Sequence, residues 1–240
     1  EVFQSGFRRA AHLRTFSLPG SEQAVREPRR SALGLLYEIF GPALFDMELA
    51  PLTAFSSAEK RVLGRMLDKG WNAPRTSSAG RLFDAIAALL DIRQTNRFEG
   101  EAAMELEFRI DWSVSTSYAF SLEAESVEGV HGAEVEGSLI VDWEPMIREL
   151  LDDLSRQCSS SLIVSKFHNS LVEMILAVAE AQDIERVMLT GGCFQNRYLV
   201  QRSIERLRSV GLSPYWHQRV PPNDGGIALG QVMAAGSLER

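Results

Sequence analysis

The chain has 240 residues, of which 45% are hydrophobic and 24% charged, and its formal net charge is −7 at pH 7. That size is enough for a full hydrophobic core, and the acidic balance argues against a nonspecific grip on nucleic acid, which needs a basic excess. The two cysteines lack zinc-site or disulfide spacing, and neither a signal peptide nor an apolar run of about 20 residues is visible, so we expect a cytoplasmic protein with no membrane or nucleic-acid partner.

The first half of the chain begins with a strand-and-turn region and continues with helices. Residues 1–25 alternate apolar and polar side chains up to a turn at Pro19-Gly20. Helical spacing of the apolar residues then predicts helices, the second of them capped by Ser56 or Ser57 and stopped by Gly70. The predicted helices cover residues 28–40, 57–69, 81–91 and 99–110.

The second half of the chain alternates strands and helices. Residues 111–142 are rich in Ser, Val and Gly and predict loops with two or three strands. Two amphipathic or apolar helices follow, at 144–157 and 160–182. The chain then predicts strand, helix, strand and helix, at 186–190, about 195–210, 212–217 and 225–236. We therefore expect an α/β sheet covered by helices, with a helical part at 1–110 and an α/β lobe at 111–240.

The first of two Gly-Gly turns, in RVMLTGGCFQNRYLV, follows a predicted strand and opens into a helix. Gly191 and Gly192 let the backbone pass close to a ligand because they carry no Cβ, and the helix start offers free N–H groups to a phosphate. Asn196 could hydrogen-bond a nucleobase or ribose. The alternative is a tight strand-to-helix turn with no ligand, because strand, Gly-Gly and helix alone do not make a nucleotide-binding fingerprint.

The second turn, in PPNDGGIALGQ, places Asp224 directly before another Gly-Gly pair. Asp224 could cap the helix that begins near Ile227, or it could offer a carboxylate to a metal ion. Open α/β sheets bind ligands beyond the carboxyl ends of their strands, so the two turns are expected to meet at one crevice.

Several segments resemble the C-terminal region of the HypF family, the carbamoyltransferases of nickel–iron hydrogenase maturation. They occur along this chain in the same order as in the family. The segments are VMLTGGCFQNRYLVQRSIERLRSVGL, VPPNDGGIALGQ, TSSAGRLFDAIAALLDI, FEGEAAMELE and LRTFSLPGSEQAVREPRRSALGLL. The resemblance covers almost the whole chain, and residues 111–137 are its loosest part. It implies a sugar-kinase/actin-like ATPase (ribonuclease H-like) lobe, with a mixed sheet covered by helices and a helical insertion. Residues 1–240 would form the C-terminal portion of one kinase-like carbamoyltransferase domain.

The resemblance also implies a reaction and site residues. Carbamoyl phosphate and ATP would form carbamoyl adenylate in an upstream domain, and the kinase-like domain would pass the carbamoyl group to the C-terminal cysteine of the acceptor protein HypE. Gly191 and Gly192 are then similar to the phosphate-side backbone contacts, Asn196 to the base or ribose contact, and Asp224 to a carboxylate ligand of the metal. Asp84 in GRLFDA resembles a ribose-facing acidic position.

Parts of the family pattern lie outside this sequence. The chain starts at Glu1 rather than Met, and we interpret it as a portion that lacks the upstream domains, the first half of the kinase-like domain and the family's metal-binding histidine pair. We therefore expect ATP or carbamoyl adenylate as ligand, a divalent metal (iron or zinc) shared with the missing half, and no activity from this portion alone. Glu105 is a further acidic candidate, and no residue is assigned as the catalytic base. The rival interpretations are an O-carbamoyltransferase, a tRNA threonylcarbamoyl-transfer relative, and a nucleotide-binding or scaffold module without chemistry.

Two cysteines and one histidine could have either a chemical or a structural role. Cys193 lies at a helix start, where a thiol can be acidified, but no histidine is near it in sequence and a packing role is favoured. Cys158 is expected to be inert. His168 lies on the long apolar helix and is interpreted as a satisfied interior histidine, with a ligand-facing hydrogen-bond donor as the alternative.

Overall fold

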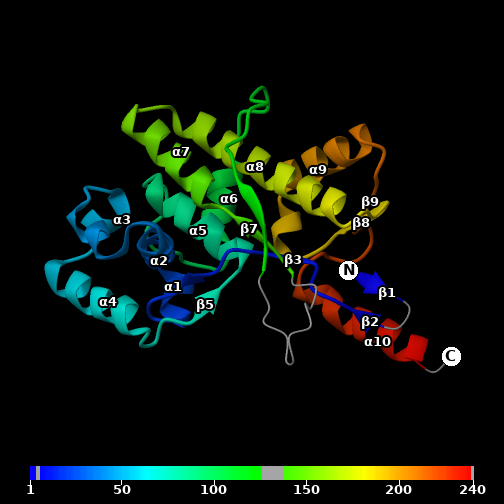
Figure 1. Ribbon diagram of the computed structural model, residues 1–240, viewed down its shortest axis with the longest axis horizontal. Coiled ribbons are helices and arrows are strands. Elements are labelled where there is room, and N and C mark those ends of the chain that lie inside the picture. Colours follow the sequence, from blue (N-terminus) through cyan, green and yellow to red (C-terminus); the bar gives the residue numbers. More distant parts are fainter. Residues whose placement is uncertain (4–5, 126–137, 239–240) are drawn as a thin grey trace. The chain divides into compact units, whose positions relative to one another are not determined.

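A computed structural model describes residues 1–3, 6–125 and 138–238 of the chain (Figure 1). The chain forms two compact units, Glu1–Phe167 and His168–Arg240, and the boundary falls inside the long helix α8 (Ser160–Ala181). The boundary that the sequence suggested at residue 110 falls within the first unit. Each unit combines helices with short strands, so the mixed α/β class is as predicted.

The first unit is mostly helical. Its helices are α1 (Glu22–Arg26), α2 (Pro28–Phe40), the 3-10 segment η1 (Gly41–Asp46), α3 (Ala50–Thr53), α4 (Ser57–Lys69), α5 (Ala79–Leu89), α6 (Glu101–Glu107) and α7 (Glu144–Ser155). The helices predicted in this part of the chain are all present. α2 and α4 have the predicted ends, and the ends of α5, α6 and α7 differ by at most three residues. The start of α4 has the predicted cap, because Ser56 and Glu59 bond each other's backbone N–H groups in a capping box.

The core of the first unit lies where α2 and α5 pack together. Leu33 and Leu36 of α2 and Ile86 of α5 are fully buried. α2 also passes so close to strand β4 (Phe16–Ser17) that a Cβ at Gly34 would overlap the carbonyl oxygen of Ser17. A glycine is therefore required at this point of the helix, although glycine normally costs an exposed helix about 1 kcal/mol relative to alanine.

The strands of the first unit form small sheets rather than the one sheet that the sequence predicted. Strand β3 (Ala11–Leu13) pairs in parallel with β7 (Leu139–Asp142), which pairs antiparallel with β6 (Ser121–Ala124), so this sheet is mixed. The remaining pairs are antiparallel: β1 (Val2–Phe3) with β2 (Gly6–Phe7), and β4 with β5 (Arg75–Thr76). These strands are two to four residues long, which is too short to build a continuous sheet across the unit.

The second unit contains the predicted strand–helix–strand–helix order. Strand β8 (Arg186–Leu189) and strand β9 (Ser213–Trp216) pair in parallel, and the chain crosses between them through the 3-10 turn η2 (Gly192–Gln195) and helix α9 (Arg197–Ser209). A second 3-10 turn, η3 (Asp224–Gly226), leads into helix α10 (Ile227–Leu238). The core joins α8 to β8 and α9 through four buried residues: Leu176, Ala179, Leu189 and Leu207.

Helix α8 differs from the expectation that the chain has no apolar run of about 20 residues. Among the described residues, it is the one helix that is long and apolar enough to cross a membrane by length and composition. However, 67% of its most apolar stretch is buried inside the protein, as in the core helix of a globular fold.

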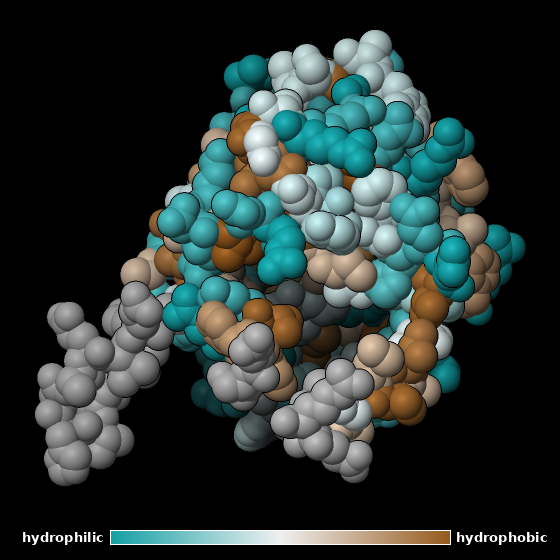
Figure 2. All heavy atoms as spheres, turned by 90° about the vertical axis from the view of Figure 1, so that its right-hand side faces the viewer, coloured by the Kyte–Doolittle hydropathy of each residue, from teal (hydrophilic) through white to brown (hydrophobic). Residues whose placement is uncertain are grey.

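Helix α10 is apolar and exposed. Ile227, Leu229, Val232 and Met233 have between 50% and 68% of their residue surface exposed. Figure 2 shows the face of the molecule to the right of Figure 1, on which hydrophobic residues gather in patches between hydrophilic ones. Helix α10 therefore differs from the usual case, in which a helix that is apolar on all sides lies inside a protein.

Candidate functional site

The two Gly-Gly turns lie next to each other at one edge of the β8–β9 pair. Because β8 and β9 are parallel, the residues that follow Leu189 and Trp216 leave the pair at the same edge. The backbone N–H of Gly191 donates a hydrogen bond of 2.8 Å to the carbonyl oxygen of Pro222. The first turn is thereby tied to the segment that leads into the second, so the two turns meet as the sequence predicts.

The two glycines of the first turn have different reasons for being glycine. Gly191 has a φ of +104°, which side chains rarely adopt, so the turn itself requires it. Gly192 has an ordinary φ, and a Cβ built on it would meet nothing within 4 Å. Its N–H also has no acceptor within the described part of the chain. None of the described residues of this unit therefore requires a glycine at position 192, where η2 begins with an exposed N–H donor.

The second turn differs from the sequence prediction in its capping residue. The side chain of Asn223, and not that of Asp224, accepts a hydrogen bond of 3.1 Å from the N–H of Gly225. Asn and Asp can both make this contact, and here the chain turns one residue earlier than predicted. Gly226 is required for packing, because its Cβ would lie 2.9 Å from the carbonyl oxygen of Pro221. The carboxylate of Asp224 is exposed and makes no ion pair or hydrogen bond within the described ranges.

Asn196 is held inside the unit by two contacts. Its side-chain oxygen accepts a hydrogen bond of 2.8 Å from the N–H of Leu199, which caps α9. Its amide nitrogen lies 3.0 Å from Nε2 of His168, and since an amide nitrogen can only donate, Nε2 is the acceptor. His168 is fully buried, which confirms the interior histidine. The predicted contact of Asn196 with a base or ribose stays a prediction.

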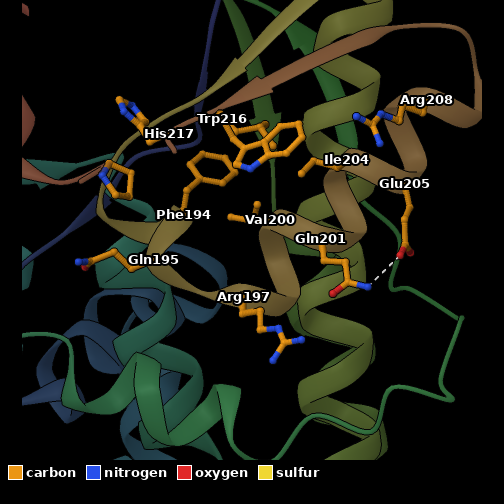
Figure 3. Close-up of a pocket in the computed structure, with 12 residues that line it drawn as sticks. Phe194, Gln195, Arg197, Val200, Gln201, Ile204, Glu205, Arg208, Trp216 and His217 are labelled. Atoms are coloured by element: carbon orange, nitrogen blue, oxygen red, sulfur yellow. Dashed lines mark hydrogen bonds between the residues drawn. The ribbon is translucent and has the colours of Figure 1, made fainter. Parts of the chain in front are cut away.

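A pocket of about 520 Å³ opens beside the first turn, between α9 and the strand ends (Figure 3). Figure 3 shows Phe194 and Trp216 beside Val200 and Ile204 of α9, which together form its apolar wall. Polar and charged side chains surround that wall: Gln195, Arg197, Gln201, Glu205, Arg208 and His217. An apolar wall with a few polar groups around it suits a small ligand with a flat ring and charged substituents.

Two residues of this region did not stand out in the sequence. Thr190 directly precedes the Gly-Gly pair, and His217 directly follows β9. Oγ1 of Thr190 lies 2.8 Å from Nε2 of His217. Both residues are the last ones of the two predicted strands, and they directly follow the observed ends of β8 and β9. The rule that placed the glycine turns at one edge could therefore also have placed Thr190 beside His217.

Asp84 lies in the first unit, buried and paired. It is 2% exposed, Arg81 lies 2.9 Å away as an ion-pair partner, and Asn96 donates a hydrogen bond of 3.4 Å to it. Burial raises the pKa of Asp84 to about 6, and Arg81 partly opposes that shift. The carboxyl thus has internal partners, and its ribose-facing role stays a prediction. Glu105 is likewise engaged, in ion pairs with Arg93 and Arg109.

The metal and cysteine chemistry has limited support inside the chain. The described residues contain no group of three His, Cys, Asp or Glu side chains that could hold a metal ion. Asp224 could therefore supply one ligand to a metal but could not hold it alone. Cys158 and Cys193 are half-buried, and neither forms a disulfide.

Comparison with known proteins gives the family. Residues 2–231 match the family model described as the carbamoyltransferase, Kae1-like domain, second subdomain, of HypF. The chain belongs to the HypF family. It is 38% identical to carbamoyltransferase HypF of Synechocystis sp., with 98% of this chain and 31% of that protein covered. It is 37% identical to HypF of Rhodobacter capsulatus, with 98% and 29% covered. The chain thus spans about a third of the length of these HypF relatives.

Solved HypF structures have the same fold. The crystal structure of a full-length HypF in a phosphate- and nucleotide-bound form matches with a TM-score of 0.83 and 35% identity, over 98% of this chain and 35% of that one. HypF of T. kodakarensis matches with a TM-score of 0.73 and 23% identity, over 96% of this chain and 30% of that one. The fold described above is therefore a HypF fold along nearly the whole chain.

Proposed function

We propose that this chain is the nucleotide-binding lobe of a HypF-type carbamoyltransferase with the sugar-kinase/actin-like fold. In the proposed reaction, a carbamoyl group passes from carbamoyl adenylate to the C-terminal cysteine of an acceptor protein of the HypE kind. Membership of the HypF family supports the transfer activity. The phosphate- and nucleotide-bound state of a HypF relative with 35% identity supports a nucleotide as the ligand.

The observation that carries the proposal is the unexplained glycine at position 192. Its backbone has room for a side chain and a conformation that any residue can adopt, and Phe194 and Gln195 of the same turn line a pocket of about 520 Å³. A close-lying ligand would account for the missing side chain, because a Cβ would occupy the space that the ligand needs. An open N–H at a strand end is also a donor suited to a phosphate oxygen.

The lining residues of the pocket and the adjoining Gly-Gly turn would share the binding of the nucleotide. The N–H of Gly192 would donate to the phosphate, whereas the N–H of Gly191 is already used to hold the turn against Pro222. Phe194 and Trp216 would offer an apolar wall to the adenine ring, since flat apolar rings stack favourably on aromatic side chains. Arg197, also at the pocket, would add positive charge on the phosphate side.

Asp224 fits the proposed metal as a single ligand. Its carboxylate is exposed and unengaged within the described ranges, and the turn that carries it is held against the phosphate-side turn. The remaining ligands would have to come from outside the described residues, because these contain no group of three possible metal ligands. A bound divalent metal would polarise the carbamoyl carbonyl for attack by the acceptor thiolate.

The nucleotide proposal is tested with a graded series at position 192. Isothermal titration calorimetry would measure the affinity of the chain for ATP and AMP with Gly192, Gly192→Ala and Gly192→Val. We expect a stepwise loss of at least tenfold in affinity, about 1.4 kcal/mol, with no change in thermal stability. Gly230→Ala is the matched control, because it also adds a Cβ in open space. Undiminished binding in Gly192→Val would rule out the proposed position of the ligand.

The transfer proposal needs the full-length protein and a choice of acceptors. Intact-mass spectrometry would follow the addition of one carbamoyl group to a protein with a C-terminal cysteine, to the same protein with that cysteine replaced by serine, to a hydroxyl-bearing small molecule and to tRNA. Modification of the cysteine acceptor alone is the expected result. Modification of the small molecule or of tRNA instead would establish one of the rival functions.

A further inference from the structure

A second cavity lies in the first unit, between η1 and α4, and no part of the proposed function uses it. Its volume is about 420 Å³. Tyr37 and Phe45 form one wall with their rings 6.5 Å apart, and α4 forms the other. At its centre, a Cβ on Gly64 would lie 3.2 Å from the ring of Phe45, so the glycine lets that ring rest on the helix.

The helix wall of this groove is positively charged. Lys60, Arg61 and Arg65 line it, on two successive turns of α4. None of the three makes an ion pair or a side-chain hydrogen bond within the described part of the chain. Three unpaired cations around one cavity stand out on a chain whose net charge is −7.

The carboxylates near the groove are already engaged. Glu59 belongs to the capping box at the start of α4 and pairs with Arg29, at 3.5 Å. Asp68, at the far end of the groove, pairs with Lys69 at 3.0 Å. Glu38 pairs with Arg75 on the other side of α2. Among the described residues, the three cations at the groove therefore have no acidic partner. Asp68 makes the end of the groove at the C-terminal part of α4 less positive than the end at Lys60.

A solvated basic helix face is the ordinary explanation for such charges, but it does not explain the cavity. Here the charges surround a hollow with an aromatic wall, and Tyr37 is half-buried there. Burial, with Asp68 and Glu38 nearby, raises the pKa of Tyr37, so its hydroxyl stays a hydrogen-bond donor. The groove thus offers an apolar wall, a donor and a cationic rim.

We propose that the groove between η1 and α4 binds a short acidic segment of a partner protein. An aromatic or aliphatic side chain of that segment lies on Phe45 and Tyr37, and its carboxylates face Lys60, Arg61 and Arg65. From residue 60 to residue 68 a helix rises about 12 Å, which matches roughly four residues of extended chain. The partner is therefore a linear segment whose contacting part is about that long and in which acidic residues flank apolar ones.

The test uses a fluorescein-labelled peptide, Glu-Asp-Phe-Glu-Asp-Leu, and fluorescence anisotropy with the 240-residue chain. The variant removes the three charges, as Lys60→Gln/Arg61→Gln/Arg65→Gln. Exposed charge pairs change Kd by at most about fivefold each, so we expect the triple variant to weaken binding by roughly tenfold to a hundredfold. A peptide with Gln and Asn in place of its acids should not bind, and replacement of its Phe by Ser should weaken binding.

A matched control separates a specific groove from general attraction. Arg26→Gln/Arg186→Gln/Arg219→Gln removes the same charge from three exposed arginines that make no ion pair within the described ranges and do not line the groove. Unchanged binding in this control, with peptide-induced amide shifts confined to η1, α4 and the end of α2, supports the proposal. Equal weakening in both triple variants, no binding at millimolar peptide, or binding of polyphosphate or a DNA oligonucleotide but not of the peptide would each overturn it.

Discussion

Replacement of Asn196 by alanine tests the interior of the second unit most directly. The side chain caps α9 through Leu199 and contacts the buried His168 with its amide. Alanine removes both contacts at once. The unfolding free energy should fall, and it should fall whether or not a nucleotide is present.

The size of that loss follows from the two contacts. Loss of an N-cap side chain costs about 1 kcal/mol. A buried polar atom that loses its partner costs roughly 1–3 kcal/mol, and Nε2 of the fully buried His168 would lose this one. The sum is roughly 2–4 kcal/mol, which is a large share of the stability of an ordinary domain.

Urea unfolding followed by far-UV circular dichroism would give the free energies, and hydrogen exchange of residues 196–210 would locate the change. Asn196→Asp keeps the capping oxygen and should lose only the part that belongs to His168. Gln195→Ala deletes a neighbouring exposed amide and should be neutral. If Asn196→Ala differed from the unchanged chain by less than about 0.5 kcal/mol, neither contact could hold the unit together. If Asn196→Ala does lose stability as expected, a weaker binding of nucleotide by this variant would not by itself show that Asn196 contacts the ligand.

Three further outcomes follow from single sites. Because the pKa of Asp84 is raised from 3.8 to about 6, the folded state holds its proton longer, so the unfolding free energy should fall as pH rises through this window, by up to roughly 3 kcal/mol from this group. Asp84→Asn should flatten that part of a stability-against-pH curve; an unchanged slope would contradict the assignment. Ser56→Ala should cost about 1 kcal/mol by breaking the capping box with Glu59, measured by urea unfolding, and a neutral result would show that the cap is not formed. Gly226→Ala should lower the melting temperature, because its Cβ would crowd the carbonyl oxygen of Pro221, whereas Gly192→Ala should not; equal effects would remove the distinction between the two turns.

The elements that the sequence predicted well depend on signals close together in the chain. Helix α4 has its Ser cap, its apolar spacing and its glycine stop within fifteen residues, so its ends could be read directly. The meeting of the two glycine turns could also be predicted, because it needs only two parallel strands and the position of their carboxyl ends.

The features that the sequence could not supply depend on partners far along the chain. Asn196 and His168 are 28 residues apart, and only the folded unit brings the amide to the ring. The pairing of Asp84 with Arg81 could be predicted, since residues three apart share a helix face. The hydrogen bond from Asn96 could not, because Asn96 lies twelve residues further along the chain, outside the helix. Whether Asn223 or Asp224 caps the second turn depends on a backbone change of one residue, which composition does not determine.

The hydrogen bond from Gly191 to Pro222 has a consequence for how the two turns move. Because this one hydrogen bond of 2.8 Å joins the two turns, neither turn can move away from the other unless the bond breaks first. The exchange rate of that single hydrogen with deuterated water therefore reports the opening of the pair, and an occupant that presses the turns together would slow it.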